Sequence, residues 1–444
     1  MISQEELQLA RFALSECLAA GAQGARVSLD KTLMSTVAVR DGATDRVSDC
    51  LDRAITFALF VDGRYGVYST NKLGREDLSA FIADSVAMTR LLSPDPLRCL
   101  PESWRCCKDA TLGNELGLCD PAFEQSPIPS AAQMSASLPE TTDCRLLSFE
   151  SEYSKSENDL VVLDSQGLFC RHTETAFEYY AEATVEDADG SKYNSYWWDS
   201  STVADRLNIE KVNRTALERS VMQMHPQSPD GGKYTMVIEL EAAARLLSPV
   251  LAALGGYNLQ QGNSFLAGSE GKRIFCPGLN VVDEPFRRGE AGSRLFCSDG
   301  TAVQDGPIIE NGCVRKYFLN DYIARKMKLS PTMEEAVRPH ILPLCPEGKN
   351  APSDCASMLE LCGDGILVTG FNGGNSNPAT GDFSFGVEGF RFEAGRIAYP
   401  VRGMLITGNL IDLWNSLYAA GTDVRPSMSK LIPTLAFSNV EFNA

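Results

Sequence analysis

The sequence predicts an α+β protein, and three observations support this fold class. An amphipathic helix opens the chain, strands bounded by turn signals recur along it, and Gly- and Pro-rich segments divide it into three units. The predicted units are an N-terminal helix-and-hairpin α/β sandwich over residues 1–100, a strand-rich middle segment over 101–230, and a larger C-terminal domain over 231–444. The last should be mostly antiparallel sheet or an irregular barrel. With 444 residues, the chain is long enough for about two or three domains.

The first unit begins with a helix whose start is marked by Ser3 and Glu6 at capping-box spacing. One face of this helix carries apolar residues, Leu7, Ala10, Leu14, Cys17 and Leu18. Branched and aromatic residues over 55–61 predict a strand, and Asp62-Gly63 predicts a hairpin turn after it. A second helix follows, indicated by Leu78, Phe81, Ile82, Val86 and Leu91. It should end before the prolines at 94 and 96, which cannot continue a helix.

The middle segment starts with an irregular connection, because residues 100–140 are rich in Pro, Ser, Gly and Cys. Short strands are expected from Arg145 onwards, with turns at 164–167 and 187–190, and a helix over about 203–222 closes the segment. In the C-terminal unit, a strand over 234–239 leads into a helix over 240–254, and short strands follow. Residues 371–381 form a long polar Gly/Asn loop, for which a functional role and a plain surface connection are equally good interpretations.

Composition excludes several classes of partner. The chain has 40 Lys+Arg and 58 Asp+Glu, a net charge of −18, which argues against nucleic acid and anionic membranes. The N-terminus lacks a signal peptide, and the uncharged stretch 246–269 contains proline and amides that are costly in hydrocarbon. Fourteen scattered cysteines without Cys-x-x-Cys indicate reduced thiols. We therefore expect a soluble cytoplasmic protein with no nucleic-acid or membrane partner.

No catalytic motif is complete in this sequence. The histidines, His172, His225 and His340, are too far apart to form His-Glu-x-x-His, and neither a Gly-x-Ser-x-Gly elbow nor a phosphate-binding glycine motif occurs. The acidic clusters at 186–189 and at Asp283-Glu284 fit solvated turns better than metal or acid/base sites.

The C-terminal region nevertheless carries a familiar pattern. Residues 365–413, which include Thr380-Gly381-Asp382-Phe383-Ser384 and Gly408-Asn409-Leu410, resemble the signature region of the TldD/PmbA family, also called modulator of DNA gyrase. Further blocks resemble the same family in order, at residues 53–71, 283–296 and 308–326. The chain is therefore identified as a member of this family.

The resemblance implies a function for a pair of proteins. In this family two related subunits form a zinc metallopeptidase that acts on small or unfolded peptides. The TldD subunit carries His-Glu-x-x-x-His at a helix start and a cysteine near its C-terminus, and the TldE/PmbA subunit lacks this site. Here the corresponding residues are Leu240, Glu241 and Arg245, and no cysteine follows Cys362. Leucine has no donor atom and arginine is a permanent cation, so neither can replace a histidine ligand.

The resemblance thus implies a TldE/PmbA-like, non-catalytic subunit with no catalytic or metal-binding residue of its own. Zinc is expected in a TldD-like partner, small or unfolded peptides are the expected substrate, and a homodimer is expected when the chain is alone. Arg245 should either form an ion pair in the emptied metal position or face the chamber shared with the partner. Candidate chamber or partner-facing loop residues are Asn375, Asn377, Asp382 and Asn409.

Two other functions stay open at this stage, and so does the question of whether this chain is an enzyme. One is a regulatory protein that acts on DNA gyrase or a toxin–antitoxin system through protein–protein contact. The other is an independent hydrolase that uses Ser384 or a cysteine as the nucleophile, although the sequence supplies no paired base.

Overall fold

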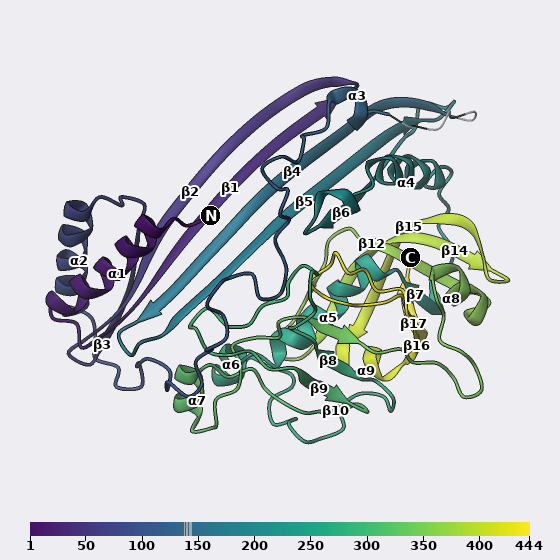
Figure 1. Cartoon of the computed structure of the whole chain (residues 1–444). Helices are drawn as coiled ribbons and strands as arrows, with labels where there is room; N and C mark the ends of the chain where they lie inside the picture. Colours follow the sequence, from purple (N-terminus) through teal and green to yellow (C-terminus); the bar gives the residue numbers. More distant parts are fainter. Residues whose placement is uncertain (137, 139–140, 142–143) are drawn as a thin grey trace.

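The computed structural model describes residues 1–136, 138, 141 and 144–444, and this part of the chain has the predicted α+β fold (Figure 1). Residues 137, 139 and 140, which belong to the predicted irregular connection, lie outside the described residues. The rest of that connection is irregular as expected, apart from the short helix α3 (Ala131–Met134).

A curved antiparallel sheet dominates the first half of the chain (Figure 1). Within the described residues it has six strands, in the spatial order β3 (Arg64–Thr70), β2 (Ala43–Val61), β1 (Gly24–Arg40), β4 (Arg145–Asp164), β5 (Phe169–Glu186) and β6 (Lys192–Ser201). β4 and β5 are 20 and 18 residues long, so the prediction of short strands was wrong here. Polar residues 154–159 interrupt the apolar alternation, yet they stay paired with β1 and β5, because backbone hydrogen bonds continue the ladder regardless of side chain.

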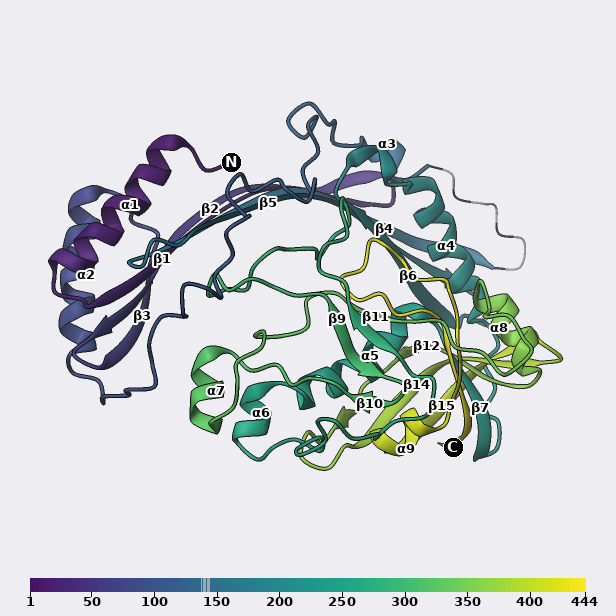
Figure 2. The ribbon, with the colours of Figure 1, turned by 60° about the horizontal axis from the view of Figure 1, so that its bottom comes forward.

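Helices cover one face of this sheet in two groups, one at each end (Figure 2). At one end, α1 (Gln4–Ala19) and α2 (Arg75–Thr89) pack on alternate residues of β1 and β2 such as Val27 and Phe57. At the other end, α3 and α4 (Ile209–Met222) pack on Phe177 and Tyr179 of β5.

The local signals at the N-terminus are confirmed. Ser3 and Glu6 form the capping box, and Asp62 and Gly63 form the hairpin turn with φ of 50° and 72°. Two residues of the predicted apolar helix patterns are not buried: Leu18 is 42% exposed and Leu91, which lies beyond the end of α2, is 86% exposed. The apolar face of α1 instead includes Ala13, which is fully buried.

The sheet continues across residue 100, because β1 pairs along most of its length with β4. The first two predicted units therefore share one sheet, and the boundaries of the three domains stay a prediction. The helix predicted over about 203–222 begins only at Ile209, as α4, and a separate short 3-10 helix, Ala204–Arg206, precedes it.

The C-terminal half forms a closed, barrel-like sheet. Strands β12 (Gly365–Phe371), β7 (Gly232–Ile238), β17 (Leu435–Asn443), β15 (Arg396–Asn409) and β14 (Asp382–Glu393) pair in this order, and β14 pairs again with β12. Only β7 and β12 among these described pairs run parallel. Short strands β13 (Asn375–Ser376) and β16 (Leu417–Ala420) attach to β14 and β17.

One apolar core unites the barrel with the helices around it. Helix α5 (Leu240–Ala253) buries Leu246, Leu247 and Val250 against barrel residues such as Phe385 and Ile406. The same core includes a small sheet of β8 (Val281–Asp283), β9 (Gly306–Glu310), β10 (Cys313–Val314) and β11 (Pro339–Ile341), with helices α6 (Gly256–Gln260), α7 (Asp321–Met327) and α9 (Leu410–Asn415) nearby. Helix α8 (Cys355–Cys362) packs on the other side of the barrel strands.

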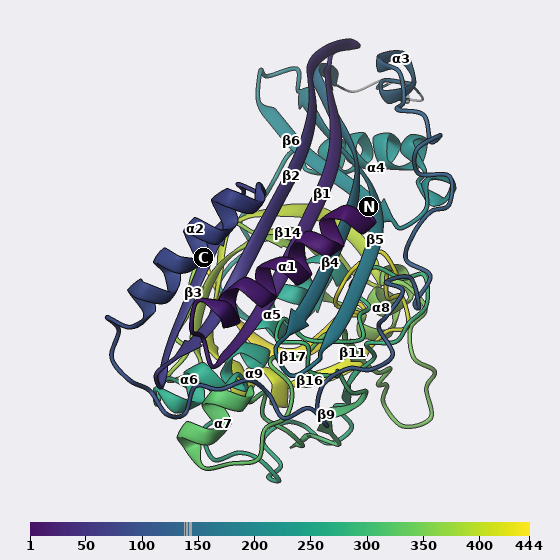
Figure 3. The same cartoon turned by 60° about the vertical axis from the view of Figure 1, so that its left-hand side comes forward.

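The C-terminal half lies under the face of the large sheet that carries no helices (Figures 2 and 3). Phe296 packs there against Val162 and Cys170, and Arg105 forms an ion pair with Asp321 of α7. No helix within the described ranges has the length and apolar character needed to cross a bilayer. Strand β6, at the edge of the large sheet, faces the barrel. The cleft between β6 and the barrel is the candidate site.

Candidate functional site

A cleft separates strand β6 and the end of α4 from the barrel. It consists of two adjoining cavities of about 260 and 230 Å³, which share the lining residues Gln223, Thr369 and Glu388. One wall is the edge strand β6, and the other is formed by β12, β14 and β15. The cleft therefore joins segments that are far apart in the sequence.

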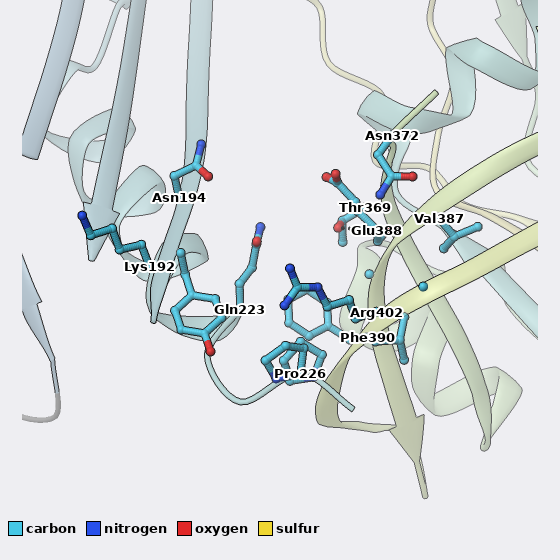
Figure 4. A pocket seen from close by; sticks show the side chains of 15 residues that line it. Lys192, Asn194, Gln223, Pro226, Thr369, Asn372, Val387, Glu388, Phe390 and Arg402 are labelled. Atoms are coloured by element: carbon cyan, nitrogen blue, oxygen red, sulfur yellow. Dashed lines mark hydrogen bonds between the residues drawn. The ribbon is translucent and has the colours of Figure 1, made fainter. Parts of the chain in front are cut away.

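Polar side chains from both walls point into the first cavity (Figure 4). Gln223 approaches from the end of α4, and Arg402 of β15 lies opposite it, with the carboxylate of Glu388 and the amide of Asn372 further along the barrel wall. Phe390 and Pro226 supply apolar surface beside them. Such a cavity, with polar groups of both signs on apolar walls, suits an amphipathic ligand such as a peptide.

Helix α5 begins at the second cavity, and its first residues include the degenerate metal-site positions Leu240, Glu241 and Arg245. Strand β7 ends at Ile238, and Glu239 adopts an extended conformation before the helix without capping it through its side chain. The Glu239 carboxylate instead accepts two hydrogen bonds from Arg219 of α4, at 3.0 and 2.9 Å. This bidentate pair fixes the start of α5 against the helix layer of the large sheet.

The carboxylate of Glu241 is occupied by Arg425, from the loop before β17. The same guanidinium donates to the Trp198 carbonyl at 2.8 Å and to Asp199 Oδ1 at 2.9 Å, both on β6. Its carbon lies 5.2 Å from the centre of the Trp197 ring and 4.8 Å from that of Trp198. Arg425 thus connects α5, β6 and the C-terminal loop at one point.

Arg245 lies one turn further along α5, is exposed, and lines the second cavity. It donates to the Gly374 carbonyl at 3.0 Å, and its guanidinium carbon lies 5.2 Å from the centre of the Phe385 ring. It forms no ion pair with any carboxylate of the described residues. Arg245 thus lines a cavity of this chain, and its expected place in a chamber shared with a partner stays a prediction.

These residues do not fit a zinc ion. Leu240 offers no donor atom, the Glu241 carboxylate is engaged by a cation, and the Arg245 guanidinium would repel a second one. Within the ranges that the structure describes, no group of three or more His, Cys, Asp or Glu side chains is arranged to hold a metal ion. We therefore assign no metal-dependent step to this chain.

The four candidate loop residues, Asn375, Asn377, Asp382 and Asn409, form hydrogen bonds mainly with neighbouring residues of the same loop region. Asp382 accepts hydrogen bonds from Thr380 at 2.7 Å and from Asn409 at 3.0 Å, which hold the pKa of Asp382 below its usual range. Asn409 also caps α9, and Asn375 and Asn377 accept from nearby backbone N–H groups. None of the four lines the two cavities, and their role toward a partner stays a prediction.

The interpretation of Asp283-Glu284 as a solvated turn was wrong for Asp283. Asp283 does not lie in a solvated turn: it is 1% exposed, on β8, and accepts hydrogen bonds from the backbone of Val337 and Arg338. Burial raises the pKa of Asp283 in spite of these two bonds. Its role is to close the small sheet, a structural task that the sequence pattern does not reveal.

The cysteines show no link to the cleft. All fourteen lie within the described residues, and none forms a disulfide. Hydrogen bonding with the Cys170 thiol lowers the pKa of Cys107 to about 6, but Cys107 lines a separate cavity of about 380 Å³ whose lining includes no histidine. Ser384 lies on β14, where Asn375 of β13 and Thr407 of β15 are its partners in the neighbouring strands.

Sequence reasoning missed the residues that define this site most strongly. Arg425 is 184 residues from Glu241, and Arg219 lies 20 residues before Glu239 on a different helix. No spacing pattern relates such positions. The only local signal was the pair of tryptophans, Trp197 and Trp198, on a strand that is otherwise polar.

The fold places the chain in a class of proteins for which structures are known. A Bacteroides thetaiotaomicron protein that carries the name modulator of DNA gyrase superposes with a TM-score of 0.93 at 34% identity, and each chain is covered completely, at 100%. TldE from Thermococcus kodakarensis shares the fold, with a TM-score of 0.81 at 19% identity over 99% of each chain.

Sequence comparison gives the same result. Residues 231–444 match the PmbA/TldA metallopeptidase C-terminal domain, and residues 130–224 match the central domain. Metalloprotease PmbA of Escherichia coli O157:H7 is 27% identical, covering 96% of this chain and 94% of its own length. The PmbA homolog of Haemophilus influenzae is 25% identical, with coverages of 95% and 92%. The chain belongs to the PmbA/TldD metallopeptidase family.

Proposed function

We propose that this chain is the TldE/PmbA-like, non-catalytic subunit of a heteromeric zinc metallopeptidase that acts on small or unfolded peptides in the cytoplasm. A TldD-like subunit would supply the zinc ion and the reacting groups. This chain would complete the chamber that admits the substrate. The observation that carries the proposal is the ion pair between Glu241 and Arg425, which occupies the one potential ligand among Leu240, Glu241 and Arg245.

Electrostatics support this assignment. Glu241 and Arg425 are 13% and 16% exposed in their side chains, so the pair is largely shielded from water. A zinc ion beside Glu241 would have to displace the guanidinium and leave it with a cation nearby, which is strongly unfavourable in a partly buried site.

The cleft supports a peptide as the ligand. Its two cavities follow strand β6 from Lys192 to Trp198, and β6 pairs with β5 on one side only among the described strands. A strand rises about 3.3 Å per residue, so this edge is long enough for an extended segment of several residues. A folded domain could not enter cavities of about 260 and 230 Å³.

Metal analysis combined with a peptide-cleavage assay tests the proposal. The full chain alone should contain less than about 0.1 equivalent of zinc and should cleave no unfolded peptide, because the helix start lacks the ligands for the metal. Addition of a TldD-type zinc subunit should restore cleavage. One equivalent of zinc in the isolated chain, together with peptide hydrolysis, would refute the proposal.

A matched pair of variants separates chamber formation from folding. Arg402→Glu reverses a charge that points into the cleft, whereas Arg396→Glu makes the same change at an exposed position of β15 outside both cavities. We expect only the first to reduce cleavage by the mixed complex, with both chains remaining folded.

A regulatory role on DNA gyrase is the second candidate, supported by the name that the Bacteroides relative carries. It would require protein–protein contact, because the net charge of −18 disfavours DNA. Capture of purified gyrase by this chain in the absence of a TldD-type subunit would favour it.

A further inference from the structure

The candidate cleft continues beyond its two cavities along strand β6. A third cavity, of about 310 Å³, adjoins the second one and shares Trp198 and Met428 with it. On the β6 side, the first cavity is lined by residues 192–194, the second by residues within 195–198, and the third by residues within 198–201. The three cavities therefore follow the edge strand from its first residue to its last, and together we call them the β6 groove.

The end of the β6 groove at Lys192 carries positive charge. Lys192 and Arg402 line the first cavity and are both exposed, and Arg402 reaches from the barrel toward Gln223 (Figure 4). Glu186, the register partner of Lys192 on β5, pairs with Arg145 instead. Among the described residues, no carboxylate forms an ion pair with Lys192 or Arg402, so both cations are available to a ligand.

The middle of the β6 groove is balanced in charge. Glu388 lines both the first and the second cavity, and Arg245 lines the second. These two side chains have opposite charges. The other charged side chains of the second cavity, Glu241 and Arg219, are already held in the ion pairs described above. The middle of the groove therefore adds no net charge.

Two carboxylates lie at the other end of the β6 groove. Glu174 and Glu178 of β5 line the third cavity, and the described residues around it include no lysine or arginine. Glu178 is exposed and has no ion-pair partner in the part of the chain that the structure describes, and Glu174 meets only His172, at 3.5 Å. The groove is thus positive where β6 begins and negative where β6 ends.

These charges match those of an extended peptide in one direction only. A peptide has a positive amine at its N-terminus and a negative carboxylate at its C-terminus, and opposite charges across an interface favour binding. We propose that the β6 groove binds an extended peptide antiparallel to β6, with a cationic N-terminal end at the carboxylates of the third cavity and an anionic C-terminal end at Lys192 and Arg402. Peptides with this order of charges would be the preferred substrates.

The backbone of β6 supports such pairing. The Trp198 carbonyl accepts a hydrogen bond from Arg425 at 2.8 Å, so it points toward the barrel and away from β5. Backbone groups alternate in direction along a strand, so those of Asn194 and Tyr196 face the groove as well. β6 has 10 residues, and at about 3.3 Å per residue a peptide of about nine residues spans the groove. This inference rests on the proposed function, which supplies the peptide as the ligand, and adds the direction and charge pattern of that peptide.

Two peptides of the same composition test the direction. The first is Lys-Ala-Ser-Gln-Ala-Ser-Gln-Ala-Glu with free ends, and the second has its Lys and Glu exchanged. The first therefore carries two positive charges at its N-terminal end and two negative charges at its C-terminal end, whereas both ends of the second are neutral. Isothermal titration calorimetry with the isolated full chain should show about tenfold weaker binding of the second peptide.

Charge reversal at each end of the groove tests the assignment. Glu178→Lys and Arg402→Glu should each weaken binding of the first peptide by about fivefold, because each makes one end of the groove neutral. The double variant should bind the two peptides equally. Glu360→Lys on α8 and Arg396→Glu on β15 are the matched controls, since they make the same changes at exposed positions outside the three cavities and should alter affinity by less than about twofold.

The calorimetry separates this inference from the proposed function. Equal affinity for the two peptides, no binding of either one up to about 1 mM, or affinities that Glu178→Lys and Arg402→Glu leave unchanged would each overturn the inference, even where the complex with a TldD-type subunit cleaves peptides. Charge-selective binding by the isolated chain would support the inference. The same binding, without cleavage after addition of the zinc subunit, would contradict the proposed function alone.

Discussion

At the scale of single residues, Arg425 is the most consequential side chain of the candidate site. It pairs with Glu241 and Asp199, donates to the Trp198 carbonyl, and covers two indole rings. Removal of one partner from a shielded ion pair leaves the other charge without compensation. Arg245, four residues after Glu241, makes only one backbone hydrogen bond and one ring contact from an exposed position.

Arg425→Ala should therefore lower the free energy of unfolding by about 2–4 kcal/mol, whereas Arg245→Ala should lower it by less than about 1 kcal/mol. Urea unfolding of the two variants, followed by circular dichroism, measures the difference. Equal effects of the two substitutions on the free energy of unfolding would mean that the Glu241–Arg425 ion pair stabilises the fold no more than the exposed contacts of Arg245 do.

At the scale of elements, closure of the barrel depends on the pairing of β12 with β14. The register shifts where Gly389 meets the β12 backbone, and a Cβ at Gly389 would lie 1.9 Å from the Leu367 carbonyl oxygen. Only glycine permits this approach, because the carbonyl belongs to a paired strand that cannot move aside. Gly408 on β15 differs, since a Cβ there would meet the Phe383 ring at an ordinary 3.5 Å.

We expect Gly389→Ala to destabilise the protein by about 2–3 kcal/mol, and Gly408→Ala to change stability by less than about 0.5 kcal/mol. Thermal unfolding of both variants under the same conditions provides the comparison. A Gly389→Ala variant as stable as the unaltered chain would show that the two strands can separate locally without cost.

At the scale of the whole molecule, two ion pairs hold the large sheet to the barrel beside the cleft. Arg219 of α4 meets Glu239 in front of α5, and Arg425 meets Asp199 of β6. Both pairs are partly shielded from water and lie at the end of the sheet opposite the α1–α2 group. They join the large sheet and its helix α4 to the barrel half, in addition to the contacts at Phe296 and between Arg105 and Asp321.

Loss of both pairs should uncouple the halves. Differential scanning calorimetry of Arg219→Ala/Arg425→Ala should resolve two unfolding transitions where the unaltered chain shows one, because each half has its own apolar core. A single transition, merely shifted to lower temperature, would indicate that the contact around Phe296 is sufficient to couple the halves.

Local features of the fold could be predicted wherever the signal is short in sequence. The capping box at Ser3 and Glu6, the turn at Asp62-Gly63 and the start of α5 at Leu240 each depend on residues within one or two turns of one another. The predicted strand length was wrong at residues 154–159, because pairing with β1 and β5 extends the strand through a polar segment. The site followed the same division: its helix start was predicted, and its arginine partners were not.

The sequence by itself determined the α+β class, the family pattern over 365–413 and the absence of histidine at Leu240 and Arg245, because these follow from residue type and local order. The tertiary structure decided which cation meets Glu241, how far the sheet extends and which strand edge stays open. Those outcomes depend on contacts between residues up to 227 positions apart, such as Arg425 with Trp198. Such contacts arise only when the chain closes on itself, and no local pattern encodes them.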